Sequence, residues 1–431
     1  MDEARPRRQT FGFMCGNFRV LTLTQVLGQF GRSLAFPYAS LYILSLGGAP
    51  AQIGLISALM PLAGLLVFPI AGYLADRAGR VKLIGLTGLV SGAIYVVYAL
   101  APDWRWLAAL AILQGFMAVQ FPPWSALIAD SLASQDRGRG MGTMNALGLG
   151  PSLLAPYVAG MLLDRTGVSV GMRVLYGAMA ALYLVSAIVN LRCLKETAAT
   201  QAAPIGWADL PRVLRSAYGS LPTLLRALAT PLKALTLVSL LGFATVALAG
   251  PFWVVYAVEH AGLSQSQWGL VLLVETALVA AASLPAGMLV DRFGRRRCML
   301  AGLTLALVTM PVFVWVEGFA PVLAVRASLA ISTAVLLPAS SALMADLAPR
   351  DKRGQIMAAL GQGSLMVGAA GSVGGPGLGL VLIIPLMAAS LLSGILYAAN
   401  PVLPWYLSTL AVLFALVLTL IYIRDPQTAE A

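Results

Sequence analysis

Two stretches of this chain are near copies of each other and lie 215 residues apart. The first reads Gly72-Tyr-Leu-Ala-Asp76-Arg77-Ala-Gly79-Arg80, and the second reads Gly287-Met-Leu-Val-Asp291-Arg292-Phe-Gly294-Arg295. Other residues repeat at nearly the same offset, among them Gln52 with Gln267, Asp136 with Asp351, Pro37 with Pro251 and Asp130 with Asp346. Because the repeat extends far beyond the copied stretch, we expect two tandem halves of similar structure.

Long apolar runs lie on both sides of each copy. Hydrophobic residues make up 59% of the chain and charged residues only 10%, and the mean hydropathy is +0.85. A helix needs about 20 apolar residues to cross the hydrocarbon layer of a bilayer. Twelve such runs can be placed, at 18–46, 52–75, 81–101, 106–130, 139–163, 172–191, 234–258, 266–290, 298–318, 321–347, 376–398 and 402–424. The sequence therefore predicts an all-α integral membrane protein with twelve transmembrane helices in two pseudo-symmetric six-helix halves.

The halves are expected at residues 1–191 and 234–431, joined by a linker at 192–233. Apolar residues of the linker recur at helical spacing from Trp207 to Leu228, with Arg212, Arg215 and Arg226 between them. This pattern is typical of a helix that lies on the inner surface of the membrane. A loosely ordered linker is the alternative, and the sequence does not decide between them.

The second half contains an insertion before its last two spans. The distance from Gly354 to Gly394 is twice that between the matching Gly140 and Gly160, so about 20 residues are added within 355–379. The added run is rich in glycine, and successive glycine amides can bind an anion, whereas a hinge is the commoner use of such a run. The role of the insertion stays open.

The basic residues indicate the orientation, because Lys and Arg concentrate in short cytoplasmic loops. If the N-terminus is inside, the outer loops keep only Arg105, Arg165 and Arg173. We therefore predict a multi-pass protein of the cell membrane with both termini in the cytoplasm. The net charge of +11 is then explained by topology, and no nucleic-acid partner is needed to account for it.

Three ionisable residues fall well inside the apolar runs, where a charge is costly and usually functional. They are Arg32 in the first span, Glu275 in the eighth and Arg326 in the tenth. Counted from the outer side, Glu275 and Arg326 lie within about 6 Å of the same depth. One reading is a structural ion pair between Glu275 and an arginine. The other is that Glu275 binds a proton in one conformation and an arginine or a cationic substrate in another.

The two copied loops combine glycines with an acid and arginines. We expect Gly72 and Gly287 to let helices approach closely, and Asp76 and Asp291 to lie near a positive helix N-terminus and pair with nearby arginines. Charge that serves only to orient the chain is the alternative, but arginine alone would suffice for that.

Two six-helix halves with Gly-x-x-x-Asp-Arg-x-Gly-Arg after the second span of each resemble the major facilitator superfamily, whose members are secondary transporters. Within it, Gln114-Gly115 and Gly150-Pro151 are most similar to the drug/proton antiporter type. The pattern departs at Ala111, where antiporter-like relatives carry an arginine that this chain has only in the second half, as Arg326. After Gly150-Pro151 the expected glycine pair is replaced by Leu154 and Ala155.

The resemblance implies that spans one, four, seven and ten line a central cavity. Helical spacing puts Gln25, Gln29 and Arg32 on one face of the first span. The cavity candidates are Gln25, Gln29, Arg32, Tyr38, Gln114, Trp253 and Arg326, with Glu275 as the candidate for proton coupling. The resemblance also implies a cytoplasmic latch between the halves in the outward-open state, for which the candidates are Gly72, Asp76, Arg77, Gly79, Arg80, Asp130, Gly287, Asp291, Arg292, Gly294, Arg295 and Asp346.

These features favour a proton-coupled exporter of small organic or drug-like molecules that works as a monomer by rocking of its halves. The rival is a carrier for an anionic metabolite, with Arg32 and Arg326 as ligands. A single histidine and no clustered cysteines argue against an enzyme, a cofactor or a metal site, and the absence of a Walker sequence argues against an ATP-driven pump. A receptor or scaffold on a transporter fold remains a third possibility, and the substrate, the direction of transport and the coupling ion are not encoded in any motif.

Overall fold

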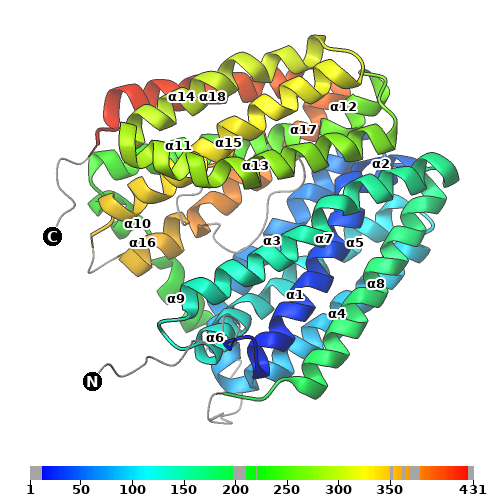
Figure 1. Ribbon diagram of the computed structural model, residues 1–431, viewed down its shortest axis with the longest axis vertical. Helices are drawn as coiled ribbons and strands as arrows, with labels where there is room; N and C mark the ends of the chain where they lie inside the picture. The colour runs from blue at the N-terminus through cyan, green and yellow to red at the C-terminus, as the bar shows by residue number, and fades with distance from the viewer. Residues whose placement is uncertain are drawn as a thin grey trace, which may run out of the picture.

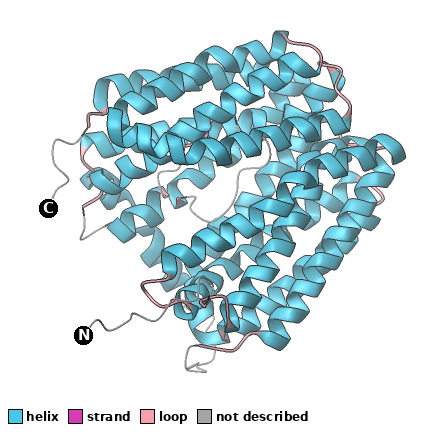
Figure 2. Ribbon diagram, viewed as in Figure 1, coloured by secondary structure: helices cyan, strands magenta, loops and turns pink. Residues whose placement is uncertain are grey.

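The computed structural model describes residues 12–197, 210–219, 221–349, 353–361, 365–368 and 379–425, and within the second span it leaves out the side chains of 66, 68, 69 and 72–78. In these residues the chain forms helices and no strands (Figure 2). The helices gather into two bundles, one from the first half and one from the second (Figure 1). The predicted all-helical, two-half architecture is therefore confirmed.

The first half contains six spans in chain order. The first span is divided into α1 (Gly16–Ala35), the 3-10 turn η1 (Phe36–Tyr38) and α2 (Ala39–Ser45). The second and third spans are α3 (Pro50–Ala78) and α4 (Arg80–Leu100). The fourth is divided into α5 (Trp104–Phe116), η2 (Met117–Gln120) and α6 (Phe121–Ser131), and α7 (Arg137–Thr166) and α8 (Val168–Cys193) complete the half.

The linker forms α9 (Leu210–Gly219) and α10 (Leu221–Ala227), and six further spans follow it. They are α11 (Thr230–Ala249) with η4 (Gly250–Phe252) and α12 (Trp253–Glu259), α13 (Gln265–Phe293), α14 (Arg295–Val312) with η5 (Phe313–Trp315), α15 (Phe319–Leu347), α17 (Leu380–Ala399) and α18 (Leu403–Tyr422). The short helix α16 (Arg353–Leu360) precedes the inserted residues. Each predicted apolar run thus coincides with a helical span, and ten of the described helical segments are long and apolar enough to cross a membrane.

Prolines divide the first and seventh spans at matching places. Pro37 lies in η1 and Pro251 lies in η4, and each turn separates the long part of its span from a short terminal helix. Proline has no N–H to donate to the preceding turn, so a break at this position is expected. The matching pair in spans four and ten behaves differently, because η2 precedes Pro122 whereas Pro338 lies inside the continuous helix α15.

The two halves meet through glycines at one end of the molecule, which we call the contact end. There α3 crosses α17, where Gly54 faces Ser390 and Gly394, and α7 crosses α13, where Gly160 faces Gln265. A Cβ atom on Gly160 would lie 2.3 Å from the carbonyl oxygen of Gln265, and one on Gly54 would lie 2.6 Å from that of Ser390. Backbone therefore packs directly on backbone, as small residues allow between membrane helices.

Hydrogen bonds also join the halves at the contact end. Asp164, near the end of α7, accepts from the backbone N–H groups of Gln265 at 2.9 Å and Ser266 at 3.1 Å, the first two residues of α13. The Tyr38 hydroxyl lies 2.7 Å from the carbonyl oxygen of Pro156 and 2.9 Å from that of Gln265. In the described part of the chain, the hydrogen bonds between the halves lie at this end. The two bundles separate toward the opposite end, which we call the termini end because the first helix, α1, begins there and the last helix, α18, ends there (Figure 1).

The linker helices touch neighbours on both sides. Tyr218 of α9 donates a hydrogen bond to the carbonyl of Leu65 in α3. The Lys233 ammonium of α11 donates to the carbonyl of Arg226 in α10 at 3.0 Å. Trp207, the first residue of the predicted interfacial helix, lies outside the described residues, and the placement of the linker on the membrane surface stays a prediction.

Replacing Gly160 by Ala should lower the stability of the protein. The new Cβ would overlap the Gln265 backbone of the other half, and overpacking of this kind costs about 1–3 kcal/mol. The matched control is Gly177→Ala, since a Cβ there meets nothing within 4 Å. Thermal unfolding in detergent should give a lower midpoint for Gly160→Ala than for Gly177→Ala, and equal midpoints would contradict the backbone contact.

Candidate functional site

Glu275 and Arg326 form an ion pair inside the second half. Glu275 lies on α13 and Arg326 on α15, and Oε2 of the glutamate is 2.5 Å from Nη2 and 3.1 Å from Nε of the arginine. The Arg326 side chain is completely buried, whereas 17% of the Glu275 side chain is exposed. An ion pair between Glu275 and an arginine, one of the two readings of the sequence, is therefore present with Arg326 as the arginine, and its glutamate is partly accessible.

One oxygen of Glu275 stays open. Both bonds from Arg326 end on Oε2, and Oε1 accepts no hydrogen bond from any residue that the structure describes. A carboxylate oxygen can accept a proton or bind a cation. The free Oε1 of the partly exposed Glu275 can thus bind a proton or a cation while Oε2 still accepts from Arg326.

Aromatic rings and a backbone carbonyl complete the surroundings of Arg326. Its guanidinium carbon lies 4.3 Å from the ring centre of Trp253 and 5.8 Å from that of Trp268. Its Nη1 donates to the carbonyl of Gly368 at 2.6 Å. A buried guanidinium is stabilised by such π faces and by charge-assisted hydrogen bonds. Arg326 is consequently enclosed by its own half and is not open to a ligand.

A cavity of about 110 Å³ lies between the halves near the contact end. Its wall is mostly aromatic and apolar, with Phe36, Tyr95 and Tyr98 from the first half and Pro251, Val254 and Trp268 from the second. Gln114 also lines it, and within the described structure the Gln114 Oε1 and Trp268 Nε1 atoms are buried without a hydrogen-bond partner. A mostly apolar wall with a few unsatisfied polar groups is typical of a site for an organic molecule.

Arg32 lies apart from this pair and has neutral partners. Its Nη1 donates to the hydroxyl of Tyr183 at 2.7 Å and its Nη2 to Oε1 of Gln29 at 2.8 Å. Among the residues that the structure describes, no carboxylate forms a salt bridge with it. Gln25, one turn before Gln29, is half-buried. The predicted face of the first span therefore carries one cation, Arg32, and two neutral amides, Gln25 and Gln29. Glu275 lies in the other half.

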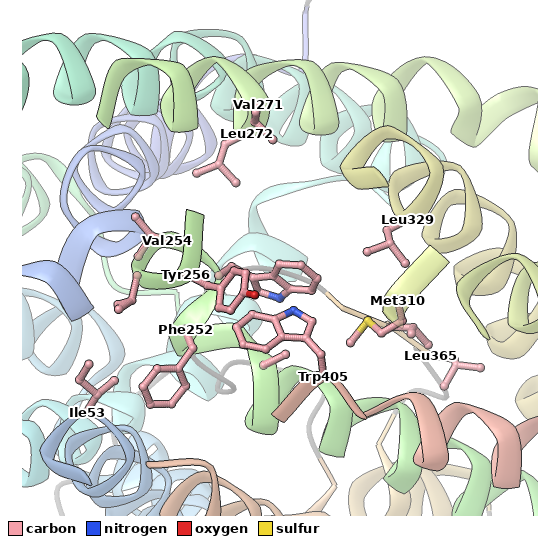
Figure 3. Packing of buried hydrophobic residues seen from close by; sticks show 14 of the residues in the cluster. Ile53, Phe252, Val254, Tyr256, Val271, Leu272, Met310, Leu329, Leu365 and Trp405 are labelled. Carbon is pink, nitrogen blue, oxygen red and sulfur yellow. The ribbon is translucent and has the colours of Figure 1, made fainter. Parts of the chain in front are cut away.

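Of the seven cavity candidates, Gln114 lines the cavity described above and the other six do not, and two of those six, Tyr38 and Trp253, are packed in the interior. Tyr38 is fully buried in the contact between the halves, where its hydroxyl reaches Pro156 and Gln265, and it does not line the cavity. Trp253 is also fully buried, within an aromatic cluster that includes Phe313 and Trp405, and Trp405 is labelled in Figure 3. Both are large aromatic side chains near the end of a divided span, so the sequence alone does not distinguish a cavity wall from a packed core.

The predicted latch residues form one cluster in each half. Nη1 of Arg80 lies 2.5 Å from Oδ2 of Asp130, and Arg295 pairs with Asp346 in the matching position. Gly79 and Gly294 have φ angles of +82° and +90°, a conformation that favours glycine and that turns the chain sharply between spans. These contacts lie within a half, so the predicted contact between halves in another state remains a prediction.

The structure gives less information on the remaining latch candidates. The side chains of Asp76 and Arg77, and the surroundings of Gly72, lie outside the described residues. Asp291 and Arg292 are exposed. A Cβ on Gly287 would meet no atom of the described residues within 4 Å, so the close helix approach expected there is not found among them.

Two acids that the sequence reasoning missed cap the helices after these loops. Glu196, just beyond α8, accepts from the N–H of Val81 at 3.0 Å, and Asp425, just beyond α18, accepts from the N–H of Arg296 at 2.8 Å. Each therefore places a negative charge at the N-terminus of the third span of its half, where the helix dipole favours it. The two acids are 229 residues apart, so a comparison at the main offset of 215 does not align them. The feature of the sequence that could have identified both residues is an acid shortly after the last span of each half.

Comparison with known proteins agrees with this geometry. The sequence profile described as Major Facilitator Superfamily matches residues 21–247 and 235–431. A multi-drug resistance efflux pump PmrA homolog of Lactococcus lactis is 32% identical over 154 residues, which is 35% of this chain and 38% of that protein. The multidrug resistance protein MdtG of Escherichia coli is 30% identical over 173 residues, 38% of this chain and 40% of its own length. The aligned regions thus span about two fifths of these relatives.

Solved structures share the fold over nearly the whole chain. The nucleoside transporter NupG has a TM-score of 0.68 at 12% identity, covering 95% of this chain and 98% of its own. A bacterial homolog of the human lysosomal transporter Spinster has a TM-score of 0.67 at 17% identity, covering 95% and 98%. At such identities the likeness concerns the fold alone, and it agrees with the profile match to both halves. The chain belongs to the Major Facilitator Superfamily, as its doubled loop predicts.

Proposed function

We propose that this protein exports organic, drug-like molecules across the cell membrane in exchange for protons, with Glu275 as the exchanging group. The observation that carries the proposal is the partly exposed Glu275, which is held on one oxygen by a buried arginine and open on the other. An ionisable residue at this depth is costly to keep and marks function. The efflux pumps among its relatives support the same reading.

The chemistry of the site favours a cationic or neutral aromatic substrate. The cavity wall offers the faces of Tyr95, Tyr98 and Trp268, and aromatic faces attract organic cations. Trp268 lines the cavity and also lies 5.8 Å from the Arg326 guanidinium, so it stands between the cavity and the ion pair. A substrate cation and a proton would then compete for Glu275.

The fold supports transport by rocking of the two halves. Their direct contacts lie at the contact end, and the bundles separate toward the termini end (Figure 1). If the termini lie in the cytoplasm, as the basic residues predict, this arrangement opens inward. An outward-open state requires the contacts of Gly54, Gly160 and Asp164 to separate while the latch clusters at the termini end approach.

An anion carrier is the second candidate, and one observation favours it. Arg32 carries a positive charge that is paired only with the neutral groups of Tyr183 and Gln29 in the described structure. Arg326 is unsuited to the ligand role expected for it, because it is buried and already holds Glu275 and Gly368. In this reading Arg32 would bind the anion alone and Glu275 would be a structural partner.

Glu275→Gln should abolish proton exchange, because glutamine keeps the shape of the side chain but cannot carry a charge that a proton neutralises. The measurement is proton movement in liposomes containing the purified protein, while lipophilic cations and organic anions are added in turn. We expect a lipophilic cation to trigger proton flux in the wild type and not in Glu275→Gln. The control is Glu317→Gln, the same change in an exposed loop. Uptake of an anion that is unaffected by Glu275→Gln would favour the carrier that uses Arg32.

Asp164→Ala should shift the protein toward the outward-open state. The change removes the cap that the first half supplies to α13, and loss of a helix cap costs about 1 kcal/mol, roughly a fivefold change in an equilibrium constant. The control is Asp103→Ala, since Asp103 caps α5 within its own half by accepting from the Arg105 N–H at 2.8 Å.

The populations are measured from distances between spin labels at positions 102 and 317, after replacement of the three native cysteines. Both positions lie in loops at the contact end, one in each half. We expect Asp164→Ala to enrich the longer distances and Asp103→Ala to leave the distribution unchanged. Identical distributions for the two variants would show that the cap does not hold the halves together.

A further inference from the structure

Four of the inserted residues, Leu365–Gly368, lie inside the second half. Leu365 and Val367 are buried, and Leu365 lies beside the chain of α11, where a Cβ on Gly242 would overlap its side chain. Gly368 lies against Met310 of α14, Leu329 of α15 and Trp253. Leu365, Met310 and Leu329 are seen in the same cluster in Figure 3. An irregular segment therefore enters the protein between transmembrane helices.

Side-chain hydroxyls satisfy the backbone of this segment. The N–H of Leu365 donates to Oγ of Ser340 at 3.0 Å, and the N–H of Gly368 donates to Oγ1 of Thr245 at 3.2 Å. The Thr333 hydroxyl donates to the carbonyl of Val367 at 3.4 Å. Non-helical backbone is tolerated at membrane depth only where the protein satisfies its polar groups. The segment is thus built into the half by three hydroxyls from α11 and α15.

The carbonyl at the end of the segment is bound by Arg326. Arg326 donates to it from Nη1 at 2.6 Å, while its Nε and Nη2 donate to Glu275. The guanidinium therefore has a charged partner on one edge and a neutral one on another. In the first half, Ala111 stands where Arg326 stands in the second, and the fifth span is the unbroken helix α7. The arginine and the insertion occur together, in one half only.

We propose that Leu365–Gly368 is a positioning element for Arg326, which keeps the guanidinium in place when the Glu275 charge is neutralised. The proposal rests on the exchange at Glu275 proposed above. A fully buried cation without a counter-charge costs several kcal/mol, so loss of the glutamate charge would otherwise destabilise this half. The Gly368 carbonyl and the two indole faces remain as partners, and they let Glu275 change its charge without displacing the arginine.

The described charges around Glu275 are consistent with this role. Arg326 is the charged side chain that contacts it in the described structure. The other charged side chains on α13 and on the helices packed against it lie toward the helix ends: Arg137, Arg139, Asp164 and Arg165 on α7, Glu259 at α12, Asp291 and Arg292 on α13, Arg295, Arg296 and Arg297 on α14, and Asp346 on α15. The uncharged titratable groups there, Tyr157 on α7, Tyr256 and His260 at α12 and Cys298 on α14, form no hydrogen bond with Glu275 in the described structure. Arg326 is therefore the cation that must be held when Glu275 is neutral.

A double-mutant cycle between Thr245 and Glu275 tests the proposal through stability alone. Thr245→Val keeps the shape of the side chain but removes the acceptor for the Gly368 N–H, and Glu275→Gln imitates the neutral glutamate. The matched control is Thr236→Val on the same helix, because the Thr236 hydroxyl bonds only to the Leu232 carbonyl of its own helix. Thermal unfolding midpoints are measured in detergent for each single variant and each pair.

We expect Thr245→Val to lower the midpoint more in the Glu275→Gln background than in the wild type, by an additional shift on the order of 2 °C, because neighbouring groups couple. Thr236→Val should lower the unfolding midpoint by the same amount in the wild type and in Glu275→Gln. Thr245→Ser, which keeps the hydroxyl, should leave the midpoint as it is with threonine at that position. A Thr245→Val/Glu275→Gln protein that fails to fold while Thr236→Val/Glu275→Gln folds counts as the expected result.

If Thr245→Val lowers the unfolding midpoint equally in the wild type and in Glu275→Gln, the proposal is overturned. If Glu275→Gln cannot be purified, the cycle is repeated with Glu275→Asp, whose shorter side chain withdraws the carboxylate from Arg326. The two proposals can fail independently, because stability tests the positioning element and proton flux tests the antiport. If Thr245 and Glu275 are coupled in stability but no proton exchange is seen in liposomes, the positioning element is supported and the proposed antiport is refuted. If proton exchange is seen without this coupling, the antiport is supported and the positioning element is refuted.

Discussion

The hydrocarbon core of a bilayer offers no hydrogen bonds, and this constraint accounts for most of the structure. A polar group at membrane depth is costly unless the protein or a water-filled cavity supplies its hydrogen-bond partner. Helices satisfy the backbone, and hydroxyls such as those of Thr22, Thr87 and Ser152 bond to carbonyls of the preceding turn of their own helix. The same requirement encloses Arg326, whose three side-chain nitrogens each donate to a neighbour, and it fixes the inserted segment through three hydroxyls.

The two halves share a plan, and the places where they differ carry the specific chemistry. The glycine crossings, the divided first and seventh spans, and the Arg80–Asp130 and Arg295–Asp346 pairs occur in both. Arg326, Glu275 and the inserted segment belong to the second half alone. The first half alone supplies Asp164. A repeated feature serves the fold and its symmetry, whereas the features present once form the proposed site.

Much of this architecture could be predicted from the sequence, because the bilayer leaves few choices. The twelve spans follow from apolar length, and the common depth of Glu275 and Arg326 allows an ion pair between them, although only the packing of α13 on α15 shows which arginine takes part. The missed residues depend on where distant segments pack. Asp425 reaches the start of α14 only because α18 returns beside it, and no local pattern encodes that return. Likewise, Tyr38 could line a cavity or join the halves, and only the packing of Pro156 and Gln265 against it decides.

Helix α13 links the proposed site to the contact between the halves. Its first two N–H groups are bound by Asp164 of the first half, and Gly269 packs against the Pro156 backbone, where a Cβ would lie 2.4 Å from the carbonyl oxygen. Trp268, between these contacts, lines the cavity, and Glu275 lies about 15 Å beyond the start of the helix. A continuous helix transmits a tilt along its whole length. In the proposed exchange, a change of partner at Glu275 would alter how α13 packs on α15, and it would act on the same helix that the first half contacts at the contact end. The proposal therefore couples occupancy of the site to the contact between the halves through α13 alone.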